Sequence, residues 1–230
     1  MTDKVKIPFT FTSKEAKEIY DGKPPQYGSE RASGFDLRCV DIDFDHCYPL
    51  PPDNKKKELD RAKQGWLEDS GIFLGDGVRS LVKTGIRVAL PTLKVRTQGS
   101  FFSMLGFDIR TNDEQKQDFS HFPMELQIRS RADLALKHGV HVLNSPGTID
   151  NDYTDEICVI LQNNGLFDEP ARWSSRITTE EFFDIKKGMP IAQGVLNPLM
   201  QAEFKELSEE EFGELATDRG SDGFGSTGIE

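Results

Sequence analysis

The run SLVKTGIRVALP, residues 80–91, decides how this chain is expected to fold. Aliphatic and β-branched residues fill it, and it ends at Pro91, which has no backbone N–H to donate to a ladder. Similar short runs are VKIPF at 5–9, HVL at 141–143 and EICVIL at 156–161, with Gly, Pro, Asn and Asp between them. Short strands separated by turn residues predict an all-β fold, either a sandwich or a barrel.

Helical patterns are scarce outside these runs. Ser13 to Tyr20 predicts a short capped helix, Lys55 to Glu68 a charged one, and Thr178 to Phe183 a single turn. We therefore expect helices to be minor additions to a β framework.

Length and composition indicate a globular protein. With 230 residues, of which 36% are hydrophobic and 29% charged, the chain can bury the core of one domain. A net charge of −11 repels a phosphate backbone, so we expect no nucleic-acid partner, although one polyphosphate could bind in a local cationic pocket with a metal ion. No apolar run approaches the ~20 residues that span a bilayer, and the N-terminal MTDKVKIPF does not resemble a secretory signal. We expect a cytoplasmic protein without a membrane partner.

The cysteines and histidines do not form a metal-binding pattern. Cys39, Cys47 and Cys158 are odd in number and lack CxxC spacing, which predicts free thiols in a reducing compartment. The histidines have no cysteine or carboxylate partners in a zinc pattern, so no zinc site is expected.

Three stretches have the character of insertions: residues 41–77, 98–122 and 164–179. Long connections in a compact domain are usually functional, partner-binding or mobile, which leaves a protein partner at the insertions as an open hypothesis. The predicted organisation is a β domain at 1–215 followed by a C-terminal arm at 216–230. The arm is rich in glycine, and glycines allow backbone N–H groups to approach phosphate oxygens closely.

Five separated motifs occur along the framework: SGFDLR at 33–38, SRADLALKHG at 130–139, NSPGTIDNDYTDE at 144–156, GMPIAQ at 188–193 and RGSDGFGSTG at 219–228. In this order they resemble the motifs of the trimeric dUTP pyrophosphatases (dUTPases). The resemblance implies an all-β, dUTPase-like β-clip or jelly-roll barrel with short helices in the insertions and a flexible glycine-rich arm. It also implies a homotrimer that hydrolyses dUTP to dUMP and pyrophosphate with Mg²⁺, which supplies dUMP and prevents uracil incorporation into DNA.

In the third motif, Asp150 matches the family's catalytic carboxylate, which orients and deprotonates the water that attacks the α-phosphorus. General-base assistance of this kind is worth about 10²- to 10⁴-fold. Asn144 matches the amide that pairs with the uracil edge across a β-hairpin. Tyr153 resembles the ring that packs below the deoxyribose and excludes a 2′-hydroxyl, and Gly147 and Ile149 are expected to line the same substrate site.

The resemblance implies that the first, second and fourth motifs bind the phosphates and the metal ion. Asp36 resembles the carboxylate that reaches Mg²⁺ through bound waters, and Mg²⁺ keeps several waters while it bridges phosphates. Arg131 and Gln193 match positions that hold the phosphates or the catalytic water network.

The arm is implied to close over the substrate. Arg219 resembles the arginine that covers the polyphosphate and so belongs with the catalytic group. Phe224 matches the ring that stacks on the base, and Gly223, Ser226 and Thr227 match contacts to the terminal phosphate. Phosphoryl transfer gains chiefly from positioning and charge stabilisation, which suits a cationic lid.

The chain departs from the family pattern at several positions. Ala132 and Asp133 stand where Ser-Gly is usual, which removes a hydroxyl and adds a carboxylate near the phosphates and is expected to affect substrate binding. An alternative register uses Arg129-Ser130 with two extra residues, but continuous agreement from Leu134 to Gly139 favours the first. Asp155 replaces a glycine, and Pro190 replaces an arginine.

Two other functions are weighed. The related dCTP deaminases need a glutamate on the strand after the third motif, and residues 157–163 contain none, so deamination is not expected. Altered base specificity stays open, as does a regulatory role in which the insertions bind a partner.

For the leading hypothesis, the family architecture implies a pocket built from three protomers. One supplies Asp36, Arg131 and Gln193, a second the 144–153 hairpin, and a third the arm.

Overall fold

The computed structural model describes residues 4–48, 60, 63–64, 72–74, 77–96, 119–164 and 183–215. The chain forms two compact units, Met1–Leu199 and Met200–Glu230. This division precedes residue 216, where the sequence predicts that the arm begins; the predicted domain boundaries themselves stay predictions. Within the described part, no helix combines the length and the apolar character needed to cross a membrane.

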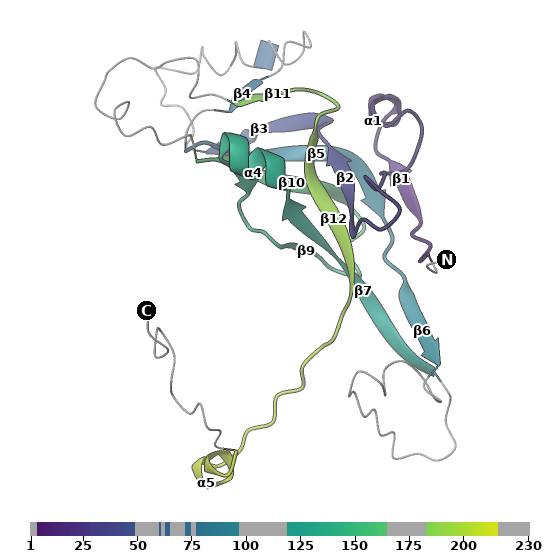
Figure 1. The fold of residues 1–230 in the computed structure, drawn as a ribbon, viewed down its shortest axis with the longest axis vertical. Helices are drawn as coiled ribbons and strands as arrows, with labels where there is room; N and C mark the ends of the chain where they lie inside the picture. Colours follow the sequence, from purple (N-terminus) through teal and green to yellow (C-terminus); the bar gives the residue numbers. More distant parts are fainter. Residues whose placement is uncertain are drawn as a thin grey trace, which may run out of the picture. The chain divides into compact units, whose positions relative to one another are not determined.

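The first sheet is built around one long central strand (Figure 1). Its five antiparallel strands are β1 (Phe9–Phe11), β3 (Asp41–Tyr48), β5 (Arg79–Val88), β8 (Val140–Val142) and β10 (Glu156–Asn163). Strand β5 pairs with β10 along most of its length and also with β3 and β1, and β8 pairs with β10. The run at 80–91 therefore provides most of the central strand of this sheet.

The second sheet carries most of the motif residues. Its five antiparallel strands are β2 (Gly34–Arg38), β6 (Thr92–Arg96), β7 (Phe119–Ser130), β9 (Gly147–Ile149) and β12 (Pro190–Pro198). The order is β2-β12-β7-β6, and β9 also pairs with β7. A separate two-stranded sheet joins β4 (Ile72–Leu74) to β11 (Phe183–Ile185).

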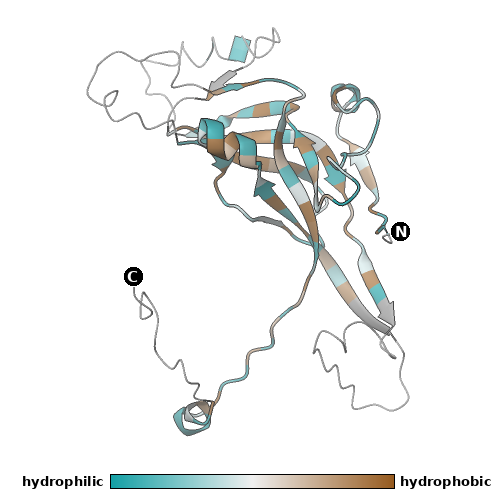
Figure 2. Cartoon of the chain, viewed as in Figure 1, coloured by the Kyte–Doolittle hydropathy of each residue, from teal (hydrophilic) through white to brown (hydrophobic). Residues whose placement is uncertain are grey.

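Both five-stranded sheets contribute to one hydrophobic core. Alternate residues of β10 are buried, and Ile157 and Leu161 are fully so, as are Leu37 and Leu126 of the second sheet. Figure 2 shows hydrophobic and hydrophilic residues alternating along the strands, as expected when each sheet buries one face. This arrangement confirms the all-β fold predicted from the sequence.

The predicted strands are present, but they begin or end at other residues than predicted. The runs at 80–91, 141–143 and 156–161 become β5, β8 and β10. The run at 5–9 reaches the sheet only at Phe9, because Pro8 has no N–H to donate and contributes its carbonyl instead, which accepts from Ala89 N at 2.9 Å.

One of three helical predictions is confirmed, and two helices in the described part of the chain, at residues 132–138 and 209–213, were not predicted. Helix α1 (Lys14–Ile19) is capped by Ser13, whose Oγ accepts from Ala16 N at 3.0 Å. Helix α4 (Ala132–His138) was not predicted, because its residues were assigned only as a motif. Its helix-forming residues followed by Gly139, which adopts φ 65°, were the available signal.

The other helical predictions fall largely outside the described residues. Within 55–68, residues 60, 63 and 64 have helical backbone. Of 178–183, only Phe183 is described, and it begins β11. The second unit contains α5 (Glu209–Gly213), which begins with a capping box between Ser208 and Glu211.

The predicted insertions overlap the framework at two ends. Residues 41–48 form β3, which pairs with β5, so the first stretch begins inside the sheet. Residues 119–122 belong to β7. Most of the remaining residues of the three stretches lie outside the described part of the chain.

Candidate active site

Pairing of β2 with β12 brings residues of the first and fourth motifs side by side. Strand β12 lies between β2 and β7 (Figure 1). Asp36 of β2 lies opposite Gln193 of β12, and Gln193 lies opposite Arg129 of β7. Residues directly opposite in antiparallel strands present their side chains on the same face. Phe35 and Leu37, which alternate with Asp36, are buried in the core, so the polar row lies on the outer face of the second sheet.

Arg131 joins this row from the residue after β7, at the N-cap of α4. Its Nη1 forms an ion pair and hydrogen bond with Oδ1 of Asp36, and its Nε lies 3.4 Å from Oδ1 of Asp133. The Arg131 side chain is 20% exposed and that of Asp36 28%. One mostly buried guanidinium is thus held between two carboxylates, and we call Asp36, Arg131, Asp133 and Gln193 the phosphate-side cluster.

The charges of this cluster do not cancel. Partial burial alone would raise the pKa of Asp133, but the Arg131 guanidinium and backbone hydrogen bonds more than offset it, so the pKa lies below its usual value. With both carboxylates ionised, the cluster has a formal charge of −1. A triphosphate therefore needs an additional positive charge to bind here without repulsion.

Arg129 and Ser130, the pair of the alternative register, form hydrogen bonds of their own at the end of β7. Arg129 Nη2 donates to Gln127 Oε1 at 2.7 Å, and Ser130 Oγ accepts from Val142 N at 2.9 Å. The pair of the alternative register is therefore engaged along β7 and with β8. Ala132 is exposed at the first turn of α4, beside Asp133.

The third motif begins with a close contact between Asn144 and Gly147. A Cβ at Gly147 would lie 3.1 Å from Nδ2 of Asn144, so the amide rests against the glycine backbone. The peptide bond between Ser145 and Pro146 is cis. Ile149 packs against the core, which fixes the far end of this segment. Strands β8 and β9 on either side of Asn144 pair with β10 and β7 in different sheets and not with each other, so the β-hairpin predicted here is not formed.

A β-turn from Asp150 to Tyr153 follows β9, and we call it the catalytic turn. Tyr153 N donates to the Asp150 carbonyl at 3.1 Å, and the Tyr153 hydroxyl donates to the Glu156 carbonyl at 2.8 Å. The Tyr153 ring is 40% exposed. The Asp150 side chain is exposed and forms no hydrogen bond or ion pair with any described residue.

Asp155, which replaces the family glycine, has a local role just beyond this turn. Its Oδ1 accepts from Glu156 N at 2.7 Å and lies 3.9 Å from Nε of Arg87. Arg87 Nε in turn donates to the Thr154 carbonyl at 2.9 Å. The substitution thus helps to hold the segment that leads into β10.

The phosphate-side cluster and the catalytic turn are separated within one chain. Ile149 pairs with Leu126, which brings Asp150 into register with Glu125, four residues along β7 from Arg129. Four strand residues span roughly 13 Å, and β9 lies on the edge of β7 opposite to β12. The same chain therefore does not place Asp150 over its own Arg131.

In the fourth motif Pro190 replaces an arginine of the family pattern, but the guanidinium of Arg38 lies nearby. Pro190 begins β12 and lies opposite Arg38, whose Nη1 donates to the Gly188 carbonyl at 2.7 Å. A proline is tolerated at the first residue of a strand, where a missing N–H costs least. The sequence analysis did not select Arg38. The predicted arm residues, Arg219, Gly223, Phe224, Ser226 and Thr227, lie outside the described residues.

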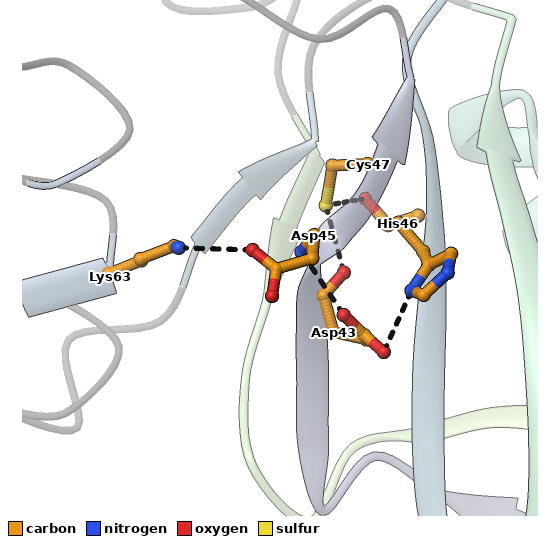
Figure 3. Close-up of polar contacts among 6 residues, drawn as sticks. Asp43, Asp45, His46, Cys47 and Lys63 are labelled. Atoms are coloured by element: carbon orange, nitrogen blue, oxygen red, sulfur yellow. Dashed lines mark hydrogen bonds and ion pairs between the residues drawn. The ribbon is translucent and has the colours of Figure 1, made fainter. Parts of the chain in front are cut away.

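A second polar cluster lies on β3 (Figure 3). His46 Nδ1 lies 2.9 Å from Asp43 Oδ2, Lys63 Nζ lies 3.5 Å from Asp45 Oδ1, and Cys47 Sγ lies near the Asp43 carbonyl. Asp43, Asp45 and Lys63 border a hollow of about 400 Å³. Among the described residues, no group of three or more His, Cys, Asp or Glu side chains is arranged to hold a metal ion. The cluster pairs its charges internally.

The cysteines are free thiols in the structure. Burial is the largest cause that raises the pKa of Cys158, to about 11, and it also raises that of Cys47. A thiol with so high a pKa is rarely a thiolate at neutral pH, so Cys158 is a poor nucleophile.

Curated relatives cover most of the chain. A deoxyuridine 5′-triphosphate nucleotidohydrolase of Chlamydia caviae is 49% identical over 204 residues, which are 89% of this chain and 90% of the relative. One from Roseobacter denitrificans is 40% identical over 163 residues, 70% of this chain and 74% of the relative. No family model matches the sequence.

Solved structures resemble the fold at low sequence identity. The dUTPase of Staphylococcus bacteriophage 80alpha with dUPNHPP has a TM-score of 0.57 and 17% identity, and the match covers 97% of this chain and 99% of that one. A mutant dUTPase from phage phi11 of S. aureus, described with a structural Mg(II) ion, has a TM-score of 0.50 and 16% identity, covering 90% of this chain and 100% of that one.

Proposed function

The chain belongs to the deoxyuridine 5′-triphosphate nucleotidohydrolase (dUTPase) family, and from this we infer that it is a dUTP diphosphatase, which hydrolyses dUTP to dUMP and pyrophosphate. The resemblance that the five motifs indicated is confirmed by relatives with up to 49% identity. We further propose which of its residues perform the reaction, how a metal ion takes part, and how the pocket is assembled.

One observation carries the proposed chemistry: the chain presents an unpartnered carboxylate and, at a separate place, a guanidinium held between carboxylates. Asp150 is exposed in its turn, without a side-chain partner among the described residues. Arg131 lies on the outer face of the second sheet beside Asp36 and Gln193. A free carboxylate suits a general base, and a guanidinium suits phosphate oxygens.

In the proposed reaction, Asp150 orients a water molecule and accepts its proton as the oxygen attacks the α-phosphorus. The bond between the α-phosphorus and the bridging oxygen breaks, and pyrophosphate leaves. Arg131 and Gln193 hold the phosphates and the water network during this displacement. Positioning and charge stabilisation account for most of the catalysis in phosphoryl transfer.

The residues fit Mg²⁺ carried by the triphosphate. Asp36 and Asp133 offer carboxylate oxygens on either side of Arg131. Mg²⁺ usually binds one or two carboxylates and takes its other ligands from water and phosphate. When bound, the ion supplies the positive charge that the phosphate-side cluster lacks. We propose Asp36 as the carboxylate that holds it through water.

The separation of the two half-sites supports a pocket shared between copies. The distance along β7 is roughly 13 Å to Arg129 and greater to Arg131, which is too far for Asp150 to act on a phosphate bound to Arg131 of the same chain. We propose a homotrimer in which one protomer supplies the phosphate-side cluster and a second supplies Asn144, Tyr153 and Asp150. The arm of a third, with Arg219 and Phe224, closes the pocket.

The test is pyrophosphate release from dUTP by the purified chain, whose mass in solution is measured in parallel. We expect release that depends on Mg²⁺, falls on addition of a chelator, and accompanies a trimeric mass. Absence of pyrophosphate at any Mg²⁺ concentration would refute the activity. Activity in a monodisperse monomer would refute only the shared pocket.

Altered base specificity is a second candidate, which the contact between Asp133 and Arg131 favours because it changes the charge next to the phosphates. A panel of deoxynucleoside triphosphates, assayed for pyrophosphate and for ammonia, separates it from dUTP hydrolysis and from deamination. Higher kcat/KM for another nucleotide than for dUTP would establish it.

A partner that binds the insertions stays a prediction. Because residues 41–48 form β3, a deletion that tests it must spare them and begin after Tyr48. Loss of a partner from a pull-down, with turnover retained, would show a second role beside catalysis. The cytoplasmic location likewise stays a prediction from the sequence.

A further inference from the structure

Asn151, next to Asp150, ties the catalytic turn to the body of the protein. Its Nδ2 donates to the carbonyls of Met124 at 2.9 Å, Leu90 at 3.2 Å and Pro91 at 3.4 Å. Leu90 and Pro91 connect β5 to β6, and Met124 lies in β7. A single side-chain amide therefore joins this turn to β7 of the second sheet and to the connection between β5 and β6.

The carbonyls of Leu90, Pro91 and Met124 converge on one place, where they need a hydrogen-bond donor. Leu90 and Met124 are buried residues. The Pro91 carbonyl also accepts from Met124 N at 3.1 Å, which holds this connection against β7. An amide NH₂ has two hydrogens and can serve convergent carbonyls, whereas a carboxylate has none and would face three oxygens with a negative charge.

The Asp150 carboxylate has no partner of its own among the residues that the structure describes, so its position depends on its backbone. The later part of this segment is fixed by Arg87, which donates to the Thr154 carbonyl at 2.9 Å. On the Asp150 side, Asn151 provides the corresponding tertiary anchor. It stands at the second position of the turn closed between Asp150 and Tyr153.

We propose that Asn151 is a positioning residue for the general base. It holds the turn so that the Asp150 carboxylate projects at a fixed place, ready for the water that attacks the α-phosphorus. This inference rests on the proposed function. A misplacement of about 1 Å at a reacting group can cost about 10²-fold in rate, so a loose turn is expected to reduce turnover more than affinity.

The first experiment compares Asn151→Ala and Asn151→Asp with the wild type. We expect kcat for dUTP to fall about 10- to 100-fold in the alanine variant and further in the aspartate variant. KM and the affinity for a non-hydrolysable dUTP analogue should change less than about 3-fold. A kcat within about 2-fold of wild type in the alanine variant would overturn the proposal, as would a loss confined to KM.

A matched control separates positioning from stability. Asn163 also donates from Nδ2 to a backbone carbonyl, that of Leu74 at 2.7 Å, and it is buried at the end of β10 that lies away from the catalytic turn. Asn163→Ala should lower Tm at least as much as Asn151→Ala while kcat stays near wild type. If both variants lose turnover in proportion to Tm, Asn151 is only structural and the proposal fails.

A double variant tests whether Asn151 acts through Asp150. In the Asp150→Asn background, Asn151→Ala should cause no further fall in kcat, because the group that it positions is already inactive. Multiplicative losses would overturn the proposal. A wild-type chain that releases no pyrophosphate from dUTP would instead refute the proposed function, so the two failures are distinct.

Discussion

The phosphate-side cluster and the catalytic turn hold their charged groups in opposite ways. In the cluster, Arg131 is mostly buried and faces Asp36 and Asp133, while Gln193 is held by strand register. In the turn, Asp150 is exposed, and backbone and neighbouring side-chain hydrogen bonds define its place.

This difference follows from what each group does in the proposed reaction. A guanidinium that binds phosphate can remain in an ion pair until substrate arrives, because phosphate oxygens can take the place of its carboxylate partners. A general base that is already paired would be a weaker base, since a nearby cation stabilises its ionised form. Among the described residues, the proposed binding groups are therefore paired while the proposed base has no side-chain partner, and four substitutions test the roles proposed for these two regions.

The largest expected effect is at Asp150. Asp150→Asn keeps the size of the side chain but removes the proton acceptor, so kcat should fall at least about 10²-fold. Binding of a non-hydrolysable analogue should be retained. Asp152→Asn, an exposed aspartate in the same turn, is the matched control. Near-normal turnover in the Asp150 variant would exclude it as the base.

Removing the cation of the cluster should have the next largest effect. Arg131→Ala deletes a charged phosphate donor and leaves Asp36 and Asp133 uncompensated. Hydrogen bonds to charged groups contribute about 1.5–3 kcal/mol, so kcat/KM for dUTP should fall about 10- to 100-fold. Steady-state kinetics measures this, with Arg79→Ala in the first sheet as control. Equal losses in both variants would count against a phosphate role for Arg131.

A smaller effect is expected where Asn144 meets Gly147. Gly147→Ala places a Cβ 3.1 Å from the Asn144 amide, which must move by a few tenths of an ångström. Because a displaced amide discriminates less between uracil and cytosine, the preference for dUTP over dCTP should fall several-fold. Gly28→Ala, which would meet no atom within 4 Å, is the control. Unchanged selectivity would argue that Asn144 does not read the base.

The smallest effect is expected at Asp133, which is 51% exposed. Asp133→Asn removes a negative charge beside the phosphates, so KM for dUTP should fall about 2- to 5-fold, whereas Glu18→Gln on α1 should change nothing. A raised KM would show instead that Asp133 assists binding.

Asp133→Asn should also change how the stability of the protein depends on pH. The folded-state pKa of Asp133 is lowered, so its contribution to stability is present above the unfolded pKa of about 3.9 and is lost as pH falls through the folded value. The Tm difference between wild type and Asp133→Asn should therefore be visible at neutral pH and shrink below about pH 4. A difference that grows in acid would contradict the lowered pKa.

The features that were not predicted have two different causes. Helix α4 has a local signal, because the helix-forming residues ADLALKH are followed by Gly139 at its end. Arg38 and Asn151 could not be selected, because nothing local distinguishes a surface arginine or a turn asparagine. Their partners are the Gly188 carbonyl and three carbonyls 27 to 61 residues away.

By itself, the sequence determined the all-β class, the family and the identity of the motif residues, because strand periodicity, turn residues and motif order are local properties of the chain. Only the tertiary structure decided which side chains meet. Cross-strand register brings Arg131 to Asp36 over 95 residues of chain, and the approach of the β5–β6 connection to β7 gives Asn151 its acceptors. A register shift of one residue would turn every side chain of a strand to the other face, so these contacts exist only once the sheets have formed.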